Sequence, residues 1–229
     1  MLTRRRRFAA RHQQRGFSLV ELMVGTAIGL FVVAGTVSLY ATNANNSRRL
    51  LLEARLNQDL RSAMDLVSRD LRRAGYWGNA INGTNITGSG GATVANPYRG
   101  IDSASADQVT YQFSHDATED EVGETEHFGF RLQDGVLQMQ TQEDHWEPMT
   151  DGTLVTVSEF SIDTTATELA LGGLCATACA VGAPNCPAMT VRQFVIRLRG
   201  QSVSDTSVQR TLEARVRPRN DQLEGQCPA

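Results

Sequence analysis

An apolar run of about 25 residues, from Phe17 to Ala41, constrains the fold of this 229-residue chain more than any other feature. An α-helix rises about 1.5 Å per residue, so such a run spans roughly 37 Å and can cross the ~30 Å hydrocarbon core of a bilayer. The run contains one charged residue, Glu21, near its beginning. A carboxylate at the bilayer centre costs about 2.5–3.5 kcal/mol, so one retained there indicates a function. The run therefore predicts a transmembrane helix in which Glu21 has a specific role.

The segment Arg15-Gly16-Phe17-Ser18-Leu19-Val20-Glu21 resembles the signature of type IV prepilins, which the pseudopilins of type II secretion systems share. The resemblance implies that a prepilin peptidase cleaves between Gly16 and Phe17 and methylates the new amino group of Phe17. It also implies that Glu21 pairs with the Phe17 amine of a neighbouring subunit during assembly. This pairing is physically reasonable, because a carboxylate and an ammonium group offset each other's desolvation cost at close range. The alternative is an ordinary membrane anchor with a tolerated acidic residue.

Residues 1–16 form a basic leader, which is too polar to be the apolar part of an ordinary signal peptide. The positive-inside tendency keeps such a leader cytoplasmic and orients the rest of the chain outward. The resemblance to prepilins implies an inner-membrane protein with a periplasmic globular domain that later becomes part of an extracellular pilus. The leader holds six of the 22 basic residues; removing it leaves 16 against 25 acidic residues, a net charge near −9. This charge does not indicate a nucleic-acid-binding protein, although a basic nucleic-acid-binding arm is the other interpretation of the leader. The six arginines are Arg4, Arg5, Arg6, Arg7, Arg11 and Arg15.

Two features of the apolar run concern its packing against other helices. Gly25 and Gly29 form a small-xxx-small pair that lets helices approach closely, although glycine is also simply common in membrane helices. No proline occurs between Phe17 and Gly75. Major pilins usually carry a proline in this helix, so the resemblance points to a minor subunit.

Residues 42–75 are predicted to continue the helix as an amphipathic segment. Apolar residues recur every three or four positions, and charged residues fill the remaining faces. Gly75 is a natural stop, so the helix is expected to end at Ala74. The apolar stripe is Leu52, Leu56, Leu60, Ala63, Val67, Leu71 and Ala74.

The segment that closes this helix, Ser68-Arg69-Asp70-Leu71-Arg72-Arg73-Ala74-Gly75-Tyr76-Trp77-Gly78, resembles that of PilW-type minor pilins of type IV pili. We expect the aromatic pair Tyr76-Trp77 to pack under a sheet. The following residues, Asn79–Gly100, are rich in Gly, Asn, Thr and Ser and are predicted to form a loop. Within them Gly88-Ser89-Gly90-Gly91 lacks the Lys-Ser/Thr of a P-loop, so phosphate binding is not predicted there.

Residues 76–229 are predicted to form a β-rich globular domain. Six segments show the alternation of β-branched or aromatic residues that is typical of strands. Gln133-Asp134-Gly135 is expected to be a hairpin turn, and Phe194, Ile196 and Leu198 are expected to face the helix. The fold class is therefore α+β and pilin-like: a long N-terminal helix packed on an antiparallel sheet. The six segments are Gln108–Phe113, His127–Leu132, Val136–Thr141, Leu154–Ile162, Val191–Arg199 and Val208–Val216.

An acidic segment and four cysteines are candidates for metal binding or for disulfide formation. The acidic segment from Asp116 to Glu126 lacks EF-hand spacing, so we expect a solvated loop rather than a Ca²⁺ site. Four cysteines lie on the predicted exported side, where an even number suggests two disulfides. Three pairings are open; we favour Cys227 joining the Cys175–Cys186 loop, which would tether the C-terminal tail, and a zinc site is the alternative. The cysteines are Cys175, Cys179, Cys186 and Cys227.

No catalytic motif is present, and the histidines His12, His115, His127 and His145 are scattered, so we expect neither an enzyme nor a cofactor. The resemblance implies a minor pilin that helps to initiate type IV pilus assembly at or near the tip. Its implied partners are the prepilin peptidase, the major pilin, other minor pilins and the inner-membrane assembly platform. A GspJ-like minor pseudopilin and a membrane-anchored binding protein or adhesin unrelated to filaments remain open.

Overall fold

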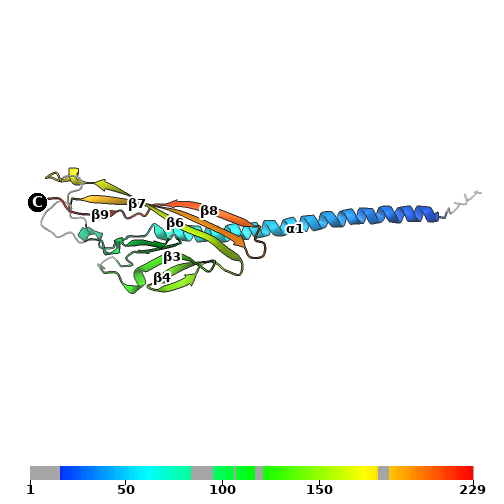
Figure 1. Ribbon diagram of the computed structural model, residues 1–229, viewed down its shortest axis with the longest axis horizontal. Coiled ribbons are helices and arrows are strands. Elements are labelled where there is room, and N and C mark those ends of the chain that lie inside the picture. Colours follow the sequence, from blue (N-terminus) through cyan, green and yellow to red (C-terminus); the bar gives the residue numbers. More distant parts are fainter. Residues whose placement is uncertain (1–15, 84–94, 106, 117–120, 180–185, 229) are drawn as a thin grey trace, which may run out of the picture. The chain divides into compact units, whose positions relative to one another are not determined.

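The computed structural model describes residues 16–83, 95–105, 107–116, 121–179 and 186–228 (Figure 1). The chain divides into two compact units, Met1–Arg49 and Leu50–Ala229. Helix α1 (Leu19–Leu71) contributes residues to both units. The predicted leader lies outside the described residues apart from Gly16.

In the second unit, α1 buries one face and exposes the other. The buried residues repeat the predicted stripe and add Met64, while Leu52 is partly buried against the same core. The helix ends at Leu71, three residues before the predicted end, because the next N–H groups bond carbonyls three residues back. Gly75, at φ +74°, then takes the left-handed conformation that glycine favours after a helix. The buried helix residues are Leu56, Leu60, Ala63, Met64, Val67 and Leu71.

The first sheet is antiparallel with strand order β1-β2-β3-β4-β5. Asp134 and Gly135 join β3 to β4 with φ of 52° and 76°, so the predicted hairpin turn is confirmed; two positive φ values suit the right-handed twist of the strands. The strands are β1 (Ile101–Ser105), β2 (Gln108–Gln112), β3 (His127–Gln133), β4 (Val136–Gln142) and β5 (His145–Pro148).

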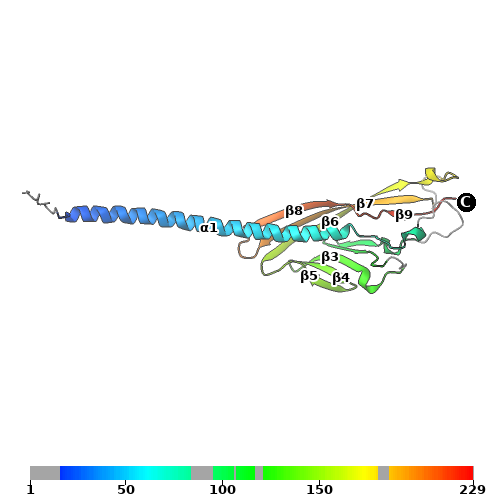
Figure 2. The same cartoon turned by 180° about the vertical axis from the view of Figure 1, so that it is seen from behind.

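The second sheet has the order β6-β7-β8, and the short strand β9 also pairs with β7. Figure 2 shows the later turns of α1 running past strands of both sheets. Beyond Ile162, strand β6 continues for eight residues that are all exposed. The strands are β6 (Val155–Ala170), β7 (Ala188–Ser202), β8 (Gln209–Val216) and β9 (Gln222–Glu224).

The hydrophobic core lies where the helix stripe meets both sheets. Phe194, Ile196 and Leu198 of β7 are at most 1% exposed and share one cluster with the buried face of α1, which confirms their predicted direction. A Cβ at Gly200 would lie 3.0 Å from Leu60 Cδ2, so this glycine lets β7 approach the helix closely. The predicted α+β, pilin-like fold class is therefore confirmed: a long N-terminal helix packs on antiparallel sheets.

The end of α1 is fixed to both sheets by polar contacts. The Tyr111 hydroxyl of β2 donates a 2.6 Å hydrogen bond to Asp70. Burial, and then the Asp70 carboxylate, raise the pKa of Tyr111 well above its ordinary value, so the hydroxyl stays protonated and donates. On the other side, the Asn220 amide after β8 donates to the carbonyls of Arg73 and Ala74 at 3.3 Å. Side chains from distant segments thus bond Asp70 in the last turn and the carbonyls of two residues that follow the helix.

One prediction about this region was partly wrong. Trp77 is buried as expected, but Tyr76 is 46% exposed and does not pack under a sheet. Residues 79–83 and 95–100 form a loop with the short 3-10 helices Ala80–Gly83 and Pro97–Arg99, while Gly88-Ser89-Gly90-Gly91 lies outside the described residues.

Candidate functional site

The predicted cleavage site lies before the first turn of α1. Gly16 and Phe17 have no regular secondary structure, and Phe17 is 84% exposed. The helix begins two residues later, and its first hydrogen bond runs from the Leu22 N–H to the Ser18 carbonyl at 3.1 Å. Peptidases cut accessible backbone outside regular secondary structure, and these residues meet both conditions.

The first part of α1 presents its apolar side chains outward on all sides. The large apolar residues from Phe17 to Tyr40 are 51–84% exposed, which is the reverse of a soluble core helix. By length and composition α1 is able to cross a membrane, and none of its most apolar stretch is buried within the chain. An apolar surface of this size in the first unit requires lipid or other protein helices around it.

Glu21 lies in the first turn of α1, exposed among these apolar side chains. Its carboxylate makes no hydrogen bond or ion pair within the described part of the chain. The hydroxyl groups of Thr26 and Thr36, in contrast, bond the carbonyls of Met23 and Val33 at 3.0 and 2.8 Å. The helix therefore satisfies these other polar groups internally and leaves one carboxylate to be satisfied from outside.

Gly25 and Gly29 follow Glu21 at intervals of four residues, so the three lie one above another on a single face of the helix. A Cβ at either glycine would meet no atom within 4 Å. Packing within this chain therefore does not require glycine there, and the face beside Glu21 is left narrow and open for a second helix.

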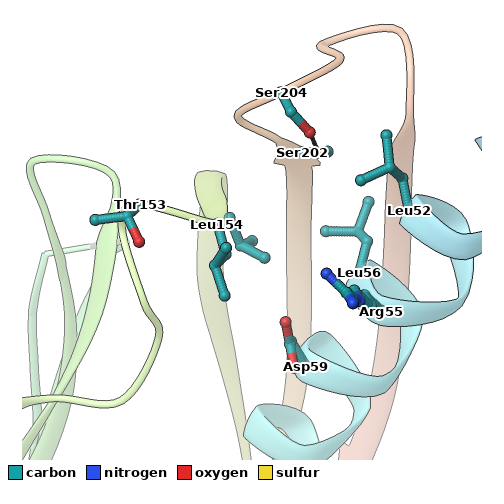
Figure 3. A pocket seen from close by; sticks show the side chains of 9 residues that line it. Leu52, Arg55, Leu56, Asp59, Thr153, Leu154, Ser202 and Ser204 are labelled. Atoms are coloured by element: carbon teal, nitrogen blue, oxygen red, sulfur yellow. Dashed lines mark hydrogen bonds between the residues drawn. The ribbon is translucent and has the colours of Figure 1, made fainter. Parts of the chain in front are cut away.

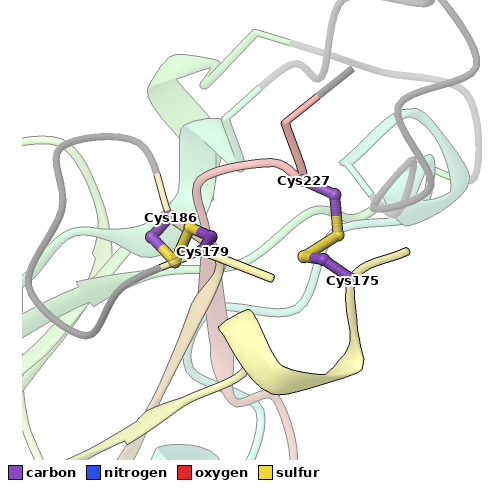
Figure 4. The surroundings of a disulfide bond; sticks show 4 residues. All are labelled: Cys175, Cys179, Cys186 and Cys227. Carbon is purple, nitrogen blue, oxygen red and sulfur yellow. A yellow bond between two sulfur atoms is a disulfide. The ribbon is translucent and has the colours of Figure 1, made fainter. Parts of the chain in front are cut away.

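The cysteines form two disulfides at the end of the second sheet (Figure 4). Cys175 is bonded to Cys227 across 52 residues, and Cys179 to Cys186 across seven. This is one of the three pairings that the sequence left open. A Cβ at Gly172 would lie 2.7 Å from Cys186 Sγ and 2.5 Å from the Cys179 carbonyl, so the loop packs too tightly there for any side chain.

A hollow of about 280 Å³ opens between α1 and the beginning of β6 (Figure 3). Leu52, Leu56 and Leu154 supply apolar walls, and Arg55 and Asp59 lie at the helix side. A second hollow shares Asp59 and Leu154 with the first and extends along the helix to Leu66, with Met149 after β5 on its other side.

Sequence reasoning missed the buried carboxylate of Glu126. The segment was predicted to be a solvated loop; Asp116, Glu121 and Glu124 are exposed, Glu119 and Asp120 lie outside the described residues, but Glu126 is only 2% exposed. Its carboxylate accepts hydrogen bonds from the His115 N–H at 2.8 Å, the Gly123 N–H at 2.9 Å and the Tyr98 hydroxyl at 2.8 Å. No spacing in the sequence signals this arrangement, because Tyr98 comes from a segment before β1 while His115 and Gly123 lie in the connection between β2 and β3.

The hydrogen bonds of Glu126 set its charge state. Burial alone raises the pKa of Glu126, but the bonds from Gly123, His115 and Tyr98 outweigh burial, and the pKa lies below its ordinary value of 4.5. Glu126 therefore holds its loops together as a carboxylate. In the described residues no group of three or more His, Cys, Asp or Glu side chains is placed to hold a metal ion.

Replacing Glu126 by glutamine is expected to lower the free energy of unfolding by about 2 kcal/mol at pH 7. The amide carries no charge, and its NH₂ group would face one of the N–H or O–H groups that now donate to the carboxylate. A group with a depressed folded pKa stabilises fully above its unfolded pKa, and that stability is lost as pH falls toward the folded pKa. The difference between wild type and Glu126→Gln should therefore shrink below about pH 4.5. Urea unfolding at several pH values measures this, with the exposed Glu124→Gln as control; a difference independent of pH would contradict it.

Comparisons with known proteins agree with this geometry. The family described as "Prepilin peptidase-dependent protein B" matches residues 49–218, and the "Prokaryotic N-terminal methylation motif" matches residues 11–37. The second match includes Gly16, Phe17 and Glu21. Among curated proteins and solved structures no significant match was found. The first match covers most of the globular unit, and the chain therefore belongs to the prepilin peptidase-dependent protein B family, as a pilin-like protein with an N-terminal methylation motif.

Proposed function

We propose that this protein is a minor pilin, of the PilW type, that helps to initiate type IV pilus assembly and is incorporated at or near the pilus tip. Cleavage by the prepilin peptidase after Gly16 would free the amino group of Phe17. The globular unit would then be periplasmic, and the assembly platform would lift it into a filament with the major pilin and other minor pilins.

The observation that carries the proposal is the unpartnered Glu21 carboxylate in an apolar helix face beside Gly25 and Gly29. A buried charge without a partner is strongly unfavourable, so the helix is suited to an assembly in which a neighbour supplies a cation. The amine freed at Phe17 of a second subunit has the required charge and lies at the correct end of the helix. The family membership also supports cleavage by a prepilin peptidase, since the family is named for its dependence on that enzyme.

We also propose that the protein acts as a substrate and a structural subunit rather than as an enzyme. Its described histidines contact different groups: His115 packs on Phe113 and Phe128, His127 lies 3.4 Å from Gln112, and His145 lies 3.4 Å from Glu147. This arrangement supports structural roles for these side chains.

Two alternatives predict different phenotypes. A minor pseudopilin of a type II secretion system shares the same N-terminal chemistry, so deletion of its gene would abolish protein secretion and leave pili intact. An adhesin independent of filaments would stay in the membrane fraction after shearing. Deleting the gene, and measuring surface pili and secreted proteins in the same strain, separates the three; our proposal expects pili to be lost and secretion to be unchanged.

Substituting Gly16 by alanine is expected to block cleavage, because the peptidase must accept the residue before the cut in a tight site. The variant should accumulate in the membrane at full precursor mass, whereas the wild type should lack residues 1–16 and carry one added methyl group. Intact mass of the membrane-extracted protein measures both. Gly35→Ala, at another helix glycine with no atom within 4 Å of its Cβ position, is the matched control and should be processed normally.

A further inference from the structure

A hollow of about 450 Å³ lies beyond the end of α1, where three arginines gather: Arg72, Arg73 and Arg219. Tyr76 and His115 also line it. After removal of the leader the net charge of the chain is near −9. Three arginines around one hollow therefore form a positively charged region on a protein that is negatively charged as a whole. Cationic groups placed close together repel one another, and an anion between them removes that repulsion.

The positions of these arginines are fixed by backbone contacts. The Arg219 N–H donates to the Arg72 carbonyl at 3.0 Å, which joins the segment after β8 to the end of the helix. Arg217 pairs with Asp221 at 2.7 Å across the same short turn. The Ser114 N–H donates to the Tyr76 carbonyl at 2.8 Å and ties the opposite wall to the end of β2. The hollow is therefore bounded by three segments that are tied together.

Arginines near a helix C-terminus often serve only to satisfy its carbonyls and dipole. Here other groups already do so: the Asn220 amide bonds the Arg73 and Ala74 carbonyls, the Arg219 N–H bonds the Arg72 carbonyl, and the Asn96 amide bonds the Gly75 carbonyl at 2.9 Å. In the described part of the chain the guanidinium groups of Arg72 and Arg219 make no ion pair or hydrogen bond. Their donors thus face solvent unused.

Arg73 is partly occupied and is held in place. Its guanidinium stacks on the Phe113 ring at 3.9 Å from the centroid and lies 3.5 Å from an Asp70 oxygen. Stacking fixes the plane of a guanidinium and leaves several of its five N–H donors available. This arginine gives the hollow one oriented wall beside the two unpaired arginines.

We propose that this hollow binds a phosphate group, either as the free anion or as a phosphate carried on a sugar. A carboxylate has two oxygens, which a single guanidinium fork satisfies. Arg72 and Arg73 at the end of the helix and Arg219 after β8 bring guanidinium groups from two segments, which match an anion with more oxygens and a charge near −2. The exposed ring of Tyr76 supplies a flat surface beside the anion, which suits a sugar ring.

The test titrates the mature full-length protein in a non-ionic detergent with inorganic phosphate, measured by calorimetry. We expect one site with a dissociation constant on the order of 1 mM, weakened by about tenfold in the double variant Arg72→Gln/Arg219→Gln. Arg210→Gln removes an exposed arginine of β8 and should bind phosphate as the wild type does. Because all three positions are exposed, melting temperatures should be unchanged, which separates lost binding from lost folding.

The same titration is repeated with glucose 6-phosphate and with acetate, and their affinities are compared with that of phosphate. Tighter binding of glucose 6-phosphate than of phosphate would identify a sugar-borne phosphate, and equal binding would identify the free anion; both results support the site. Acetate binding as tightly as phosphate would overturn the assignment. It would equally be overturned by the absence of saturable phosphate binding, or by equal affinities of the double variant and Arg210→Gln.

Discussion

Glu21→Ala is expected to leave cleavage and membrane insertion intact and to remove the protein from sheared filaments almost completely. Alanine makes insertion easier, since a carboxylate in the hydrocarbon core costs about 2.5–3.5 kcal/mol. The same substitution leaves the neighbour's amine without its anion, and breaking one side of a buried charge pair costs about 3–5 kcal/mol. At about 1.4 kcal/mol per factor of ten, that range corresponds to a loss of incorporation of at least a hundredfold.

The measurement is the ratio of protein in the filament fraction to protein in the membrane fraction, by immunoblot of cells that express each variant from the native locus. Glu21→Gln keeps the shape and hydrogen-bonding length of the side chain and removes only its charge, so it should behave as alanine does. Asp65→Ala is the matched control, because Asp65 is an exposed acidic residue of the same helix outside the apolar run. Wild-type incorporation of Glu21→Ala would show that the charge is not used in assembly and would remove the main support for the minor-pilin proposal.

The pattern of the sequence predicted the helix and the central strands because their periodicity reflects one-sided burial. Leu56, Leu60 and Leu71 face the core because residues three and four apart share a helix face, and Phe194, Ile196 and Leu198 do so because alternate strand residues share a sheet face. Asp134-Gly135 was recognisable because few residues tolerate two successive positive φ values.

Three stretches of strand that the sequence did not reveal, β5, β9 and the second half of β6, contain no buried residue that could produce a pattern. β9 is three residues long, β5 contains Pro148 and a mostly exposed set of side chains, and the second half of β6 is exposed on both faces. β1 has one large apolar residue, Ile101. Backbone pairing with neighbouring strands, rather than side-chain burial, defines these elements.

The candidate site divides in the same way. Gly16, Phe17 and Glu21 are close in sequence, so the resemblance to the prepilin signature could be recognised from one short segment. Glu126 and the hollow at Arg72 and Arg219 depend on segments that only the tertiary fold brings together, such as the Arg219 N–H on the Arg72 carbonyl. Disulfide pairing has the same property, since four cysteines allow three pairings and the sequence does not select one.

Removing the Cys175–Cys227 disulfide, as Cys175→Ser/Cys227→Ser, is expected to lower the free energy of unfolding of the globular unit by about 4 kcal/mol. A cross-link restricts the unfolded chain, and the effect grows with the logarithm of the loop it closes. This disulfide joins residues 52 apart in sequence. Removing the Cys179–Cys186 disulfide, whose cysteines are seven residues apart, is the matched control and should cost about 2 kcal/mol.

Urea unfolding of both double variants under oxidising conditions compares the two losses directly. Replacing both cysteines of a pair avoids a free thiol, which would otherwise exchange with the remaining disulfide. A larger loss for the short loop than for the long one would contradict a stabilisation that arises from loop closure.

The long-range disulfide also determines how firmly the C-terminal segment is held. Without it, β9 would depend on three residue pairs with β7, on the Arg192–Gln222 hydrogen bond and on an exposed Arg99–Glu224 ion pair at 3.8 Å. Surface ion pairs contribute about 0–1 kcal/mol, so these contacts alone hold the strand weakly. Amide hydrogen exchange in Gln222–Glu224 should therefore accelerate strongly in Cys175→Ser/Cys227→Ser, whereas exchange in β8, which has eight residue pairs with β7, should rise only as far as global stability falls.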